Sequence, residues 1–265
     1  MTHNPEFTIC EFYKAFADLD ELMELTQVLF LKLHRRASTM RDDGCAIEPP
    51  TVFPTEFRQI EFIPFVEAAL RQDMKDSGYT FPDLSLPEAK EALLAIFREL
   101  GLPIPANASL PKLLDALGDR YIEQSCVDPT FVKHHPAIMS PLAKSFICPQ
   151  TNQLVSARAE LFIAGIEYAN MYEEENSPFE QRRKFEDQLM VRGNDGEASA
   201  EVDESYIEAL EWGLPPTGGW GCGVDRMVML FAGTDRIADV LPFGTLRNVV
   251  GMAQNGRPVK TSKTE

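Results

Sequence analysis

The sequence lacks long apolar runs, an excess of basic residues and any pairing pattern among its cysteines. No apolar run approaches the roughly 20 residues that a membrane-spanning helix needs, so no span is expected. The formal net charge of −16 argues against a broad basic surface for nucleic acid. The five cysteines are scattered, which argues against a zinc cluster or a disulfide framework and favours a reducing compartment. The segment from Met1 to Glu11 resembles neither a signal peptide nor a transit sequence.

The composition is that of an ordinary globular protein. It is 44% hydrophobic and 25% charged, and 265 residues suit one large domain or one domain with an insertion. Apolar spacing predicts a helix from Glu11 to about Arg36. Ser85 and Ser109 are predicted to open helices within a helical insertion that covers residues 56–125 and carries no recognisable chemistry. The polar tail at 255–265 is predicted to be disordered.

A glycine-rich stretch stands out near the C-terminal end. Four glycines fall within the six residues Gly218–Gly223, and a predicted helix with Arg226 in its first turn follows them. Glycines at this spacing let a ligand approach the backbone, because no Cβ is in the way. A cation in a first turn opposes the helix dipole, which suggests that Arg226 binds an anion. The alternative is a glycine-rich bulge packed in the core, with Arg226 in a salt bridge.

The second informative stretch is a predicted strand pair, Arg158–Ile163 and Ile166–Glu174, joined by a tight turn. Along the second strand Asn170, Tyr172 and Glu174 alternate, so they share one face. An amide, a phenol and a carboxylate on one face indicate a polar recognition surface.

Two further carboxylates belong to the same strand pair. Glu167 is out of phase with the recognition face, so a bulge or an irregular strand start must re-aim it if it acts there. Glu160 and Glu167 can approach each other across the strands, and two such carboxylates suit Mg²⁺. The alternative is that both face solvent. His134 and His135 are interpreted as a polar strand edge, because no third metal ligand clusters with them.

Together these segments resemble class II aminoacyl-tRNA synthetases of the lysyl subgroup, and their sequence is most similar to that of the fungal mitochondrial enzymes. The resemblance covers about 1–37 and 126–250. Its segments follow the family's order: Thr2–Thr8 with Glu11 and Tyr13 (second half of motif 2), Glu160–Glu174, Leu210–Thr217 and Gly218–Arg226 (motif 3).

The resemblance implies an α+β fold, with an antiparallel six-stranded sheet flanked by helices. It implies activation of lysine by ATP to lysyl-adenylate, followed by transfer to tRNA(Lys), with Mg²⁺ as cofactor. It also implies a homodimer and a mitochondrial matrix location, with the cytoplasm as the alternative. Two other functions stay open: a catalytically inactive binding or regulatory module, and transfer of lysine to a protein.

The resemblance also implies roles for individual residues. Predicted catalytic residues are Arg226, Glu160 and Glu167, of which Glu160 and Glu167 are the metal ligands. Predicted ATP-binding residues are His3, Asn4, Phe7, Gly223 and Arg226. Predicted lysine-binding residues are Glu11, Tyr13, Asn170, Tyr172, which replaces the commoner phenylalanine, and Glu174.

The family places an anticodon-binding OB-fold domain, motif 1 and the first half of motif 2 before the position of His3. Motif 1 builds the dimer interface, and the first half of motif 2 carries an arginine for the α-phosphate. We therefore expect the chain to be the C-terminal part of a longer catalytic domain, truncated at motif 2. We expect its activity to depend on the upstream parts.

Overall fold

The computed structural model describes residues 6–40, 53–194 and 201–241. His3, Asn4 and the predicted tail at 255–265 lie outside these ranges. The helices and strands follow one another in the order β1 (Ile9–Ala15), α1 (Leu19–Met40), β2 (Arg58–Glu61), α2 (Phe62–Asp73), α3 (Ala89–Glu99), α4 (Leu110–Leu117), β3 (Thr130–Lys133), β4 (Ser145–Ile147), β5 (Leu154–Ser156), β6 (Arg158–Ile163), β7 (Ile166–Glu173), α5 (Pro178–Asn194), α6 (Glu204–Glu211), β8 (Thr217–Gly223) and α7 (Val224–Ala232).

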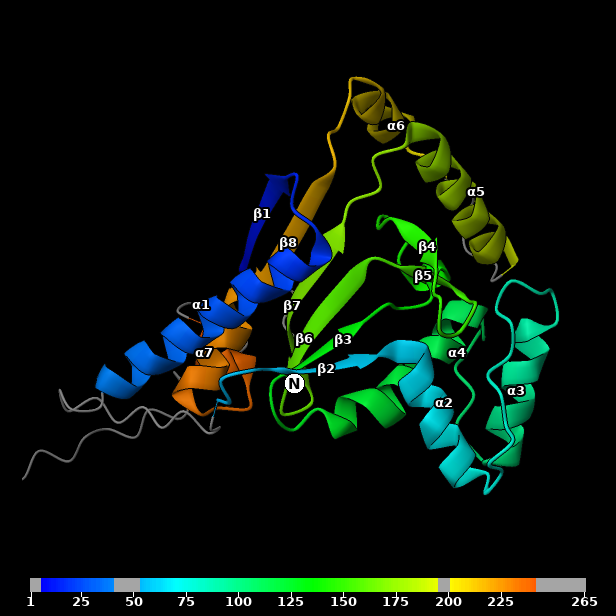
Figure 1. The fold of residues 1–265 in the computed structure, drawn as a ribbon, viewed down its shortest axis with the longest axis horizontal. Coiled ribbons are helices and arrows are strands. Elements are labelled where there is room, and N and C mark those ends of the chain that lie inside the picture. Colours follow the sequence, from blue (N-terminus) through cyan, green and yellow to red (C-terminus); the bar gives the residue numbers. More distant parts are fainter. Residues whose placement is uncertain (1–5, 41–52, 195–200, 242–265) are drawn as a thin grey trace, which may run out of the picture.

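A six-stranded sheet runs through the centre of the molecule, in the order β1-β8-β7-β6-β3-β2 (Figure 1). All neighbouring strands are antiparallel except β2 and β3, which are parallel. The α+β class and the helix-flanked sheet are confirmed. Strands β4 and β5 form a separate two-stranded sheet.

The predicted helix from Glu11 to Arg36 is wrong at its start, because the first residues form β1. This strand pairs with β8 along its whole length. Phe12 stacks on Trp220 of β8, with ring centroids 5.1 Å apart, while its neighbours Glu11 and Tyr13 point to the opposite face. Phe12 therefore follows the two-residue period of a strand, which its helical spacing to later apolar residues concealed.

Helix α1 begins only at Leu19, after a sharp change of backbone direction. Phe16 has a φ of 62°, which a right-handed helix cannot accommodate. The Asp18 carboxylate accepts a hydrogen bond from the Glu21 amide at 2.9 Å, as an N-cap residue does. The start of this helix is thus decided by a cap that follows the strand.

The predicted insertion at 56–125 contains helices α2, α3 and α4, but it begins with β2, which joins the central sheet. Ser109 precedes α4 as predicted. Ser85 does not open α3, which starts at Ala89. Both the amide and the hydroxyl of Ser85 bond the Asp83 carboxylate instead, which forms a local turn that competes with the helix.

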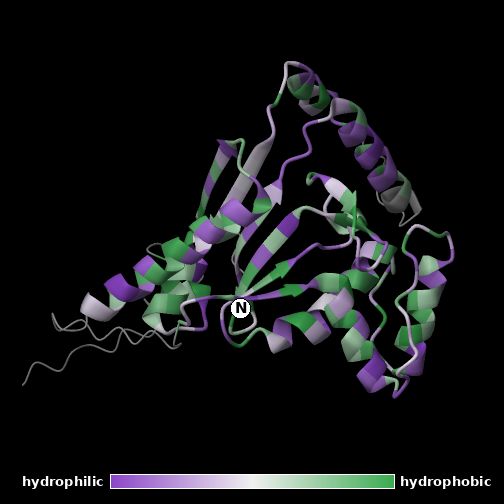
Figure 2. Ribbon diagram, in the orientation of Figure 1, coloured by the Kyte–Doolittle hydropathy of each residue, from purple (hydrophilic) through white to green (hydrophobic). Residues whose placement is uncertain are grey.

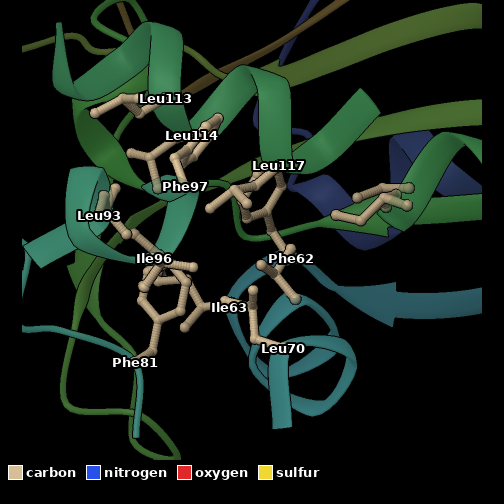
Figure 3. Close-up of a cluster of buried hydrophobic side chains, with 14 of the residues drawn as sticks. Phe62, Ile63, Leu70, Phe81, Leu93, Ile96, Phe97, Leu113, Leu114 and Leu117 are labelled. Carbon is tan, nitrogen blue, oxygen red and sulfur yellow. The ribbon is translucent and has the colours of Figure 1, made fainter. Parts of the chain in front are cut away.

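The helices of the insertion enclose a core of their own (Figure 3). Its fully buried members include Leu70 of α2, Leu93 of α3 and Leu114 of α4. Val132 and Phe162 of the central sheet belong to the same cluster. The insertion is therefore packed against the β3 and β6 side of the sheet and adds to its stability.

A second core lies between α1 and one face of the sheet. Leu22 and Phe30 of α1 pack there with Met171 and Trp220 of the strands. The opposite face of β1, β7 and β8 is left for the polar residues described below. Helix α5 is largely hydrophilic (Figure 2) and packs against α6. No helix in the described ranges is long and apolar enough to cross a membrane.

Candidate functional site

Two adjoining cavities lie over strands β1, β7 and β8. The first, here called the wide chamber, has a volume of about 410 Å³, and its lining includes Phe7, Glu11, Glu167, Asn170, Gly221, Gly223 and Arg226. The second, the narrow chamber, has a volume of about 170 Å³ and is lined by Glu11, Tyr13, Asn170, Tyr172, Glu174, Gly219, Trp220 and Gly221. Glu11, Asn170 and Gly221 line both chambers, so they form one continuous trough.

The residues predicted for ATP and for lysine lie toward different ends of this trough, with Glu11 and Asn170 shared by both chambers. Glu160 lines neither chamber but a third cavity, with His135 and Arg158. Phe7, Gly223 and Arg226, assigned to ATP, line the wide chamber. The five residues assigned to lysine all line the narrow one. His3 and Asn4 lie outside the described residues.

The glycines of β8 lie in different surroundings, so the absence of a Cβ has a different consequence at each. A Cβ on Gly219 would lie 1.8 Å from an oxygen of the Glu174 carboxylate, so only glycine fits there. A Cβ on Gly218 would lie 2.9 Å from Leu22 of α1. At Gly221 the nearest atom would be Cγ of Glu11 at 3.7 Å, so this part of the trough floor is open. Gly219 thus leaves space for the Glu174 side chain, Gly218 allows α1 to pack closely, and Gly221 leaves room for a ligand.

Arg226 lies in the first turn of α7 and bridges to β7. Its guanidinium donates to the Glu167 carbonyl oxygen at 2.6 Å and to the Glu167 carboxylate at 3.3 Å. The Arg226 side chain is still 43% exposed and lines the wide chamber. The salt bridge considered as an alternative is therefore present, and it leaves guanidinium surface open to an anion.

A bulge aims Glu167 into the wide chamber. Leu161 pairs with Ala169, but the next residue, Phe162, pairs with Glu167, so Tyr168 is the extra residue of β7. Tyr168 is buried in the core on the α1 side. The bulge predicted from the phase of Glu167 is confirmed, and it lets Glu167 share a cavity with Asn170.

Glu160 is buried rather than solvent-facing, contrary to the alternative considered above. One carboxylate oxygen pairs with Arg158, and the other lies 3.1 Å from Nε2 of His135. Burial raises the pKa of Glu160, but the interactions with His135 and Arg158 outweigh burial and hold its pKa below the usual value. Glu160 is therefore an ionised carboxylate held in a fixed orientation.

The strand-edge interpretation is wrong for His135, which is only 3% exposed. His134 turns the chain with a φ of 58°, and its ring pairs with Glu61 at 3.2 Å. This turn places His135 beneath Glu160. Burial lowers the pKa of His135, so the neutral ring donates from Nε2 to Glu160. Its Nδ1 is buried without a hydrogen-bond partner among the described residues.

Glu167 and Glu160 are close enough to affect each other's charge. Burial and the charge of Glu160 raise the pKa of Glu167, while Arg226 opposes this shift. A divalent cation would relieve the repulsion between two such carboxylates. No group of three His, Cys, Asp or Glu side chains with metal-site geometry exists within the described ranges. A cation held by this pair would therefore need oxygen ligands from water or substrate, as Mg²⁺ usually has.

Glu174 lies in the narrow chamber with its carboxylate across β8. It is 8% exposed, and no donor in the described part of the chain bonds its carboxylate. Burial raises the pKa of Glu174 to about 7. Nearby, Asn170 donates to the Tyr172 hydroxyl at 3.0 Å. A buried carboxylate without a protein partner is suited to a cationic ligand.

Comparison with known proteins identifies the family of this chain. The model of the family described as tRNA synthetases class II (D, K and N) matches residues 1–247. The chain belongs to this family.

Curated relatives of similar sequence are named lysine–tRNA ligases. A lysine–tRNA ligase of Mycoplasmopsis synoviae is 38% identical over 249 residues, which are 93% of this chain and 47% of the relative. A probable cytoplasmic lysine–tRNA ligase of Encephalitozoon cuniculi is 40% identical over 93% of this chain and 48% of its own length. A mitochondrial lysine–tRNA ligase of Schizosaccharomyces pombe is 39% identical over 94% and 46%. The chain thus spans about half the length of the curated relatives it matches.

Three residues at this candidate site were not predicted from the sequence to belong to it. Arg158 and His135 hold Glu160, and Tyr206 of α6 lies near the narrow chamber. Burial and the charges of Glu174 and Tyr13 raise the pKa of Tyr206. The two-residue spacing of Arg158 and Glu160 was a usable signal, because it places both on one face of β6. No sequence signal marks Tyr206.

Proposed function

We propose that this chain is the C-terminal catalytic part of a longer lysine–tRNA ligase. In this reaction ATP activates lysine to lysyl-adenylate with release of pyrophosphate, and the lysyl group is then transferred to tRNA(Lys). The family membership and the names of the relatives support the reaction class. The geometry of the trough supports the choice of amino acid.

The unpaired carboxylate of Glu174 carries this proposal. It is buried in the narrow chamber, lacks a protein donor among the described residues and lies beside Tyr13 and Tyr172. The ε-ammonium of lysine would supply the missing positive charge and hydrogen-bond donors. A neutral or acidic amino acid side chain would leave Glu174 desolvated and unpaired, which is costly. The chamber therefore favours a cationic substrate.

The wide chamber fits ATP and Mg²⁺ in the same proposal. Glu167 of this chamber and the nearby Glu160, which lines the neighbouring cavity, would hold Mg²⁺ together with phosphate oxygens, and the mutual repulsion of these carboxylates supports that fit. Bound Mg²⁺ would neutralise phosphate charge during attack on the α-phosphate. Arg226 has guanidinium surface left to bind the γ-phosphate. Phe7 lies at the same chamber and is 58% exposed, which suits stacking on adenine.

Lysine-dependent ATP–pyrophosphate exchange tests the proposal. It is measured on this chain and on a version extended upstream, since the relatives are about twice as long. We expect exchange in the extended protein, and Glu174→Gln there should weaken lysine far more than ATP. The exposed Glu208→Gln on α6 is the matched control. Absence of exchange in both proteins, or equal losses for lysine and ATP in Glu174→Gln, would contradict the proposal.

The homodimer and the mitochondrial location belong to the proposal as predictions. Relatives named for the mitochondrion and for the cytoplasm match at 39% and 40% identity. Cell fractionation tests the location, and light scattering on the extended protein tests the dimer.

A further inference from the structure

We propose that Arg158 is a positioning residue that couples the metal-binding carboxylate Glu160 to the lysine pocket, through Asn170 and Tyr172. This inference rests on the proposed function and concerns one residue to which neither the motifs nor the relatives assign a role.

The four residues form a block on one face of neighbouring strands. Arg158 pairs with Tyr172, and Glu160 pairs with Asn170, in the register of β6 and β7. Directly paired residues of antiparallel strands share a face, and the two pairs are two residues apart, so all four side chains share it. Glu160 belongs to the predicted metal site, whereas Asn170 and Tyr172 line the narrow chamber. Arg158 thus lies between the two halves of the site.

Each nitrogen of the Arg158 guanidinium has a different partner. Nη2 pairs with Glu160, and Nε donates to Oδ1 of Asn170 at 3.3 Å. Nη1 donates to the Ser140 hydroxyl at 3.0 Å and to the Met139 carbonyl oxygen at 3.4 Å. The Arg158 side chain is only 14% exposed, so water competes little for these donors.

The same guanidinium also orders the ring in the lysine pocket. Its Cζ lies 5.5 Å from the centroid of the Tyr172 ring, in cation–π distance. Because Oδ1 of Asn170 accepts from Arg158, its Nδ2 is directed to the Tyr172 hydroxyl at 3.0 Å. Both ends of the Asn170 amide are therefore hydrogen-bonded, which fixes the orientation of the amide and of the Tyr172 ring. Losing Arg158 would free both groups.

This arrangement requires the planar fork of arginine rather than a positive charge alone. A lysine at position 158 would keep a cation beside Glu160, but one ammonium cannot reach Glu160, Asn170 and Ser140 in their present directions. Arg158→Lys should therefore preserve the metal half of the site and disorder the lysine half. Arg158→Met should impair both, because Glu160 would lose its charge partner.

The experiment compares these variants in the extended protein by ATP–pyrophosphate exchange. For Arg158→Lys we expect the KM for lysine to rise on the order of tenfold, as for the loss of one or two buried interactions. Its half-saturating Mg²⁺ concentration should stay within about twofold of the wild type. Arg158→Met should raise both quantities. The exposed Arg183→Lys on α5, where Arg183 pairs with Glu180 and Asp187, is the matched control.

A double-mutant cycle separates positioning from a general effect on folding. If Arg158 acts on lysine through the Tyr172 ring, Arg158→Lys should raise the KM for lysine by less than about twofold in a Tyr172→Leu background. Full additivity would overturn the inference. An unchanged KM for lysine, or a fall in kcat that follows the loss of Tm, would overturn it as well. If wild-type protein shows no lysine-dependent exchange, the proposed function fails and this inference with it; a failure confined to the variants refutes only the inference.

Discussion

Replacing Glu174 by glutamine should stabilise the ligand-free chain while removing its affinity for lysine. Burial raises the pKa of Glu174 from 4.5 to about 7. The folded state therefore holds the proton more tightly than the unfolded state, so the free energy of unfolding falls as the pH rises from 4.5 to 7. At 1.36 kcal/mol per pKa unit, the ionised carboxylate costs about 3 kcal/mol above pH 7. Glutamine has nearly the same shape without this cost.

Unfolding by urea and by heat at pH 5 and pH 8 measures the effect on this chain. At pH 8 we expect Glu174→Gln to be about 3 kcal/mol more stable than wild type, or about 6 °C in Tm at roughly 2 °C per kcal/mol. At pH 5 the difference should fall to below about 1 kcal/mol, because the folded wild type is protonated there and only the unfolded chain is still largely ionised. The exposed Glu208→Gln should show no such pH dependence.

The second part of the test measures how lysine binding changes the Tm of the extended protein. It should raise the Tm of wild type increasingly from pH 6 to pH 8, as Glu174 ionises, and should not raise that of Glu174→Gln. Norleucine, which lacks the ε-ammonium, should raise neither. The reasoning is refuted if Glu174→Gln is no more stable than wild type at pH 8, or if its gain is equal at both pH values.

Three further predictions concern packing and accessibility. Gly219→Ala should cost about 1–3 kcal/mol of stability and block lysine binding, because its Cβ would meet the Glu174 carboxylate; Gly221→Ala, with its nearest contact at 3.7 Å, should cost less in urea unfolding. Leu114→Ala should lower the free energy of unfolding by about 2–5 kcal/mol, since it leaves a cavity in the core of the insertion, and a loss below about 1 kcal/mol would contradict that packing. In a Cys45→Ser background, iodoacetamide should alkylate the exposed Cys10 first, and mass spectrometry should find the buried Cys126, Cys148 and Cys222 protected. Burial also raises the thiol pKa of Cys222 to about 12, which slows its alkylation further.

Local patterns in the sequence predicted the parts of the site that depend on neighbours along the chain. The alternation of Asn170, Tyr172 and Glu174 predicted one polar face, and the phase of Glu167 predicted the bulge that the structure contains. The glycine spacing before Arg226 predicted where the wide chamber has its partly exposed guanidinium. These features follow from the periods of a strand and a helix, which are local properties of the backbone.

Contacts between distant segments were decided only by the tertiary structure. Residues 9–15 form a strand because β8 is there to pair with them, although the apolar spacing favoured a helix. His135 is buried between Phe62 of α2 and Glu160 of β6, and Glu174 lies across β8 because residue 219 has no Cβ. Sequence patterns report which residues share a face, but which faces meet depends on strand pairing between segments up to about 200 residues apart. For that reason the types of the functional groups were readable from the sequence, whereas their partners and their charge states were set by the fold.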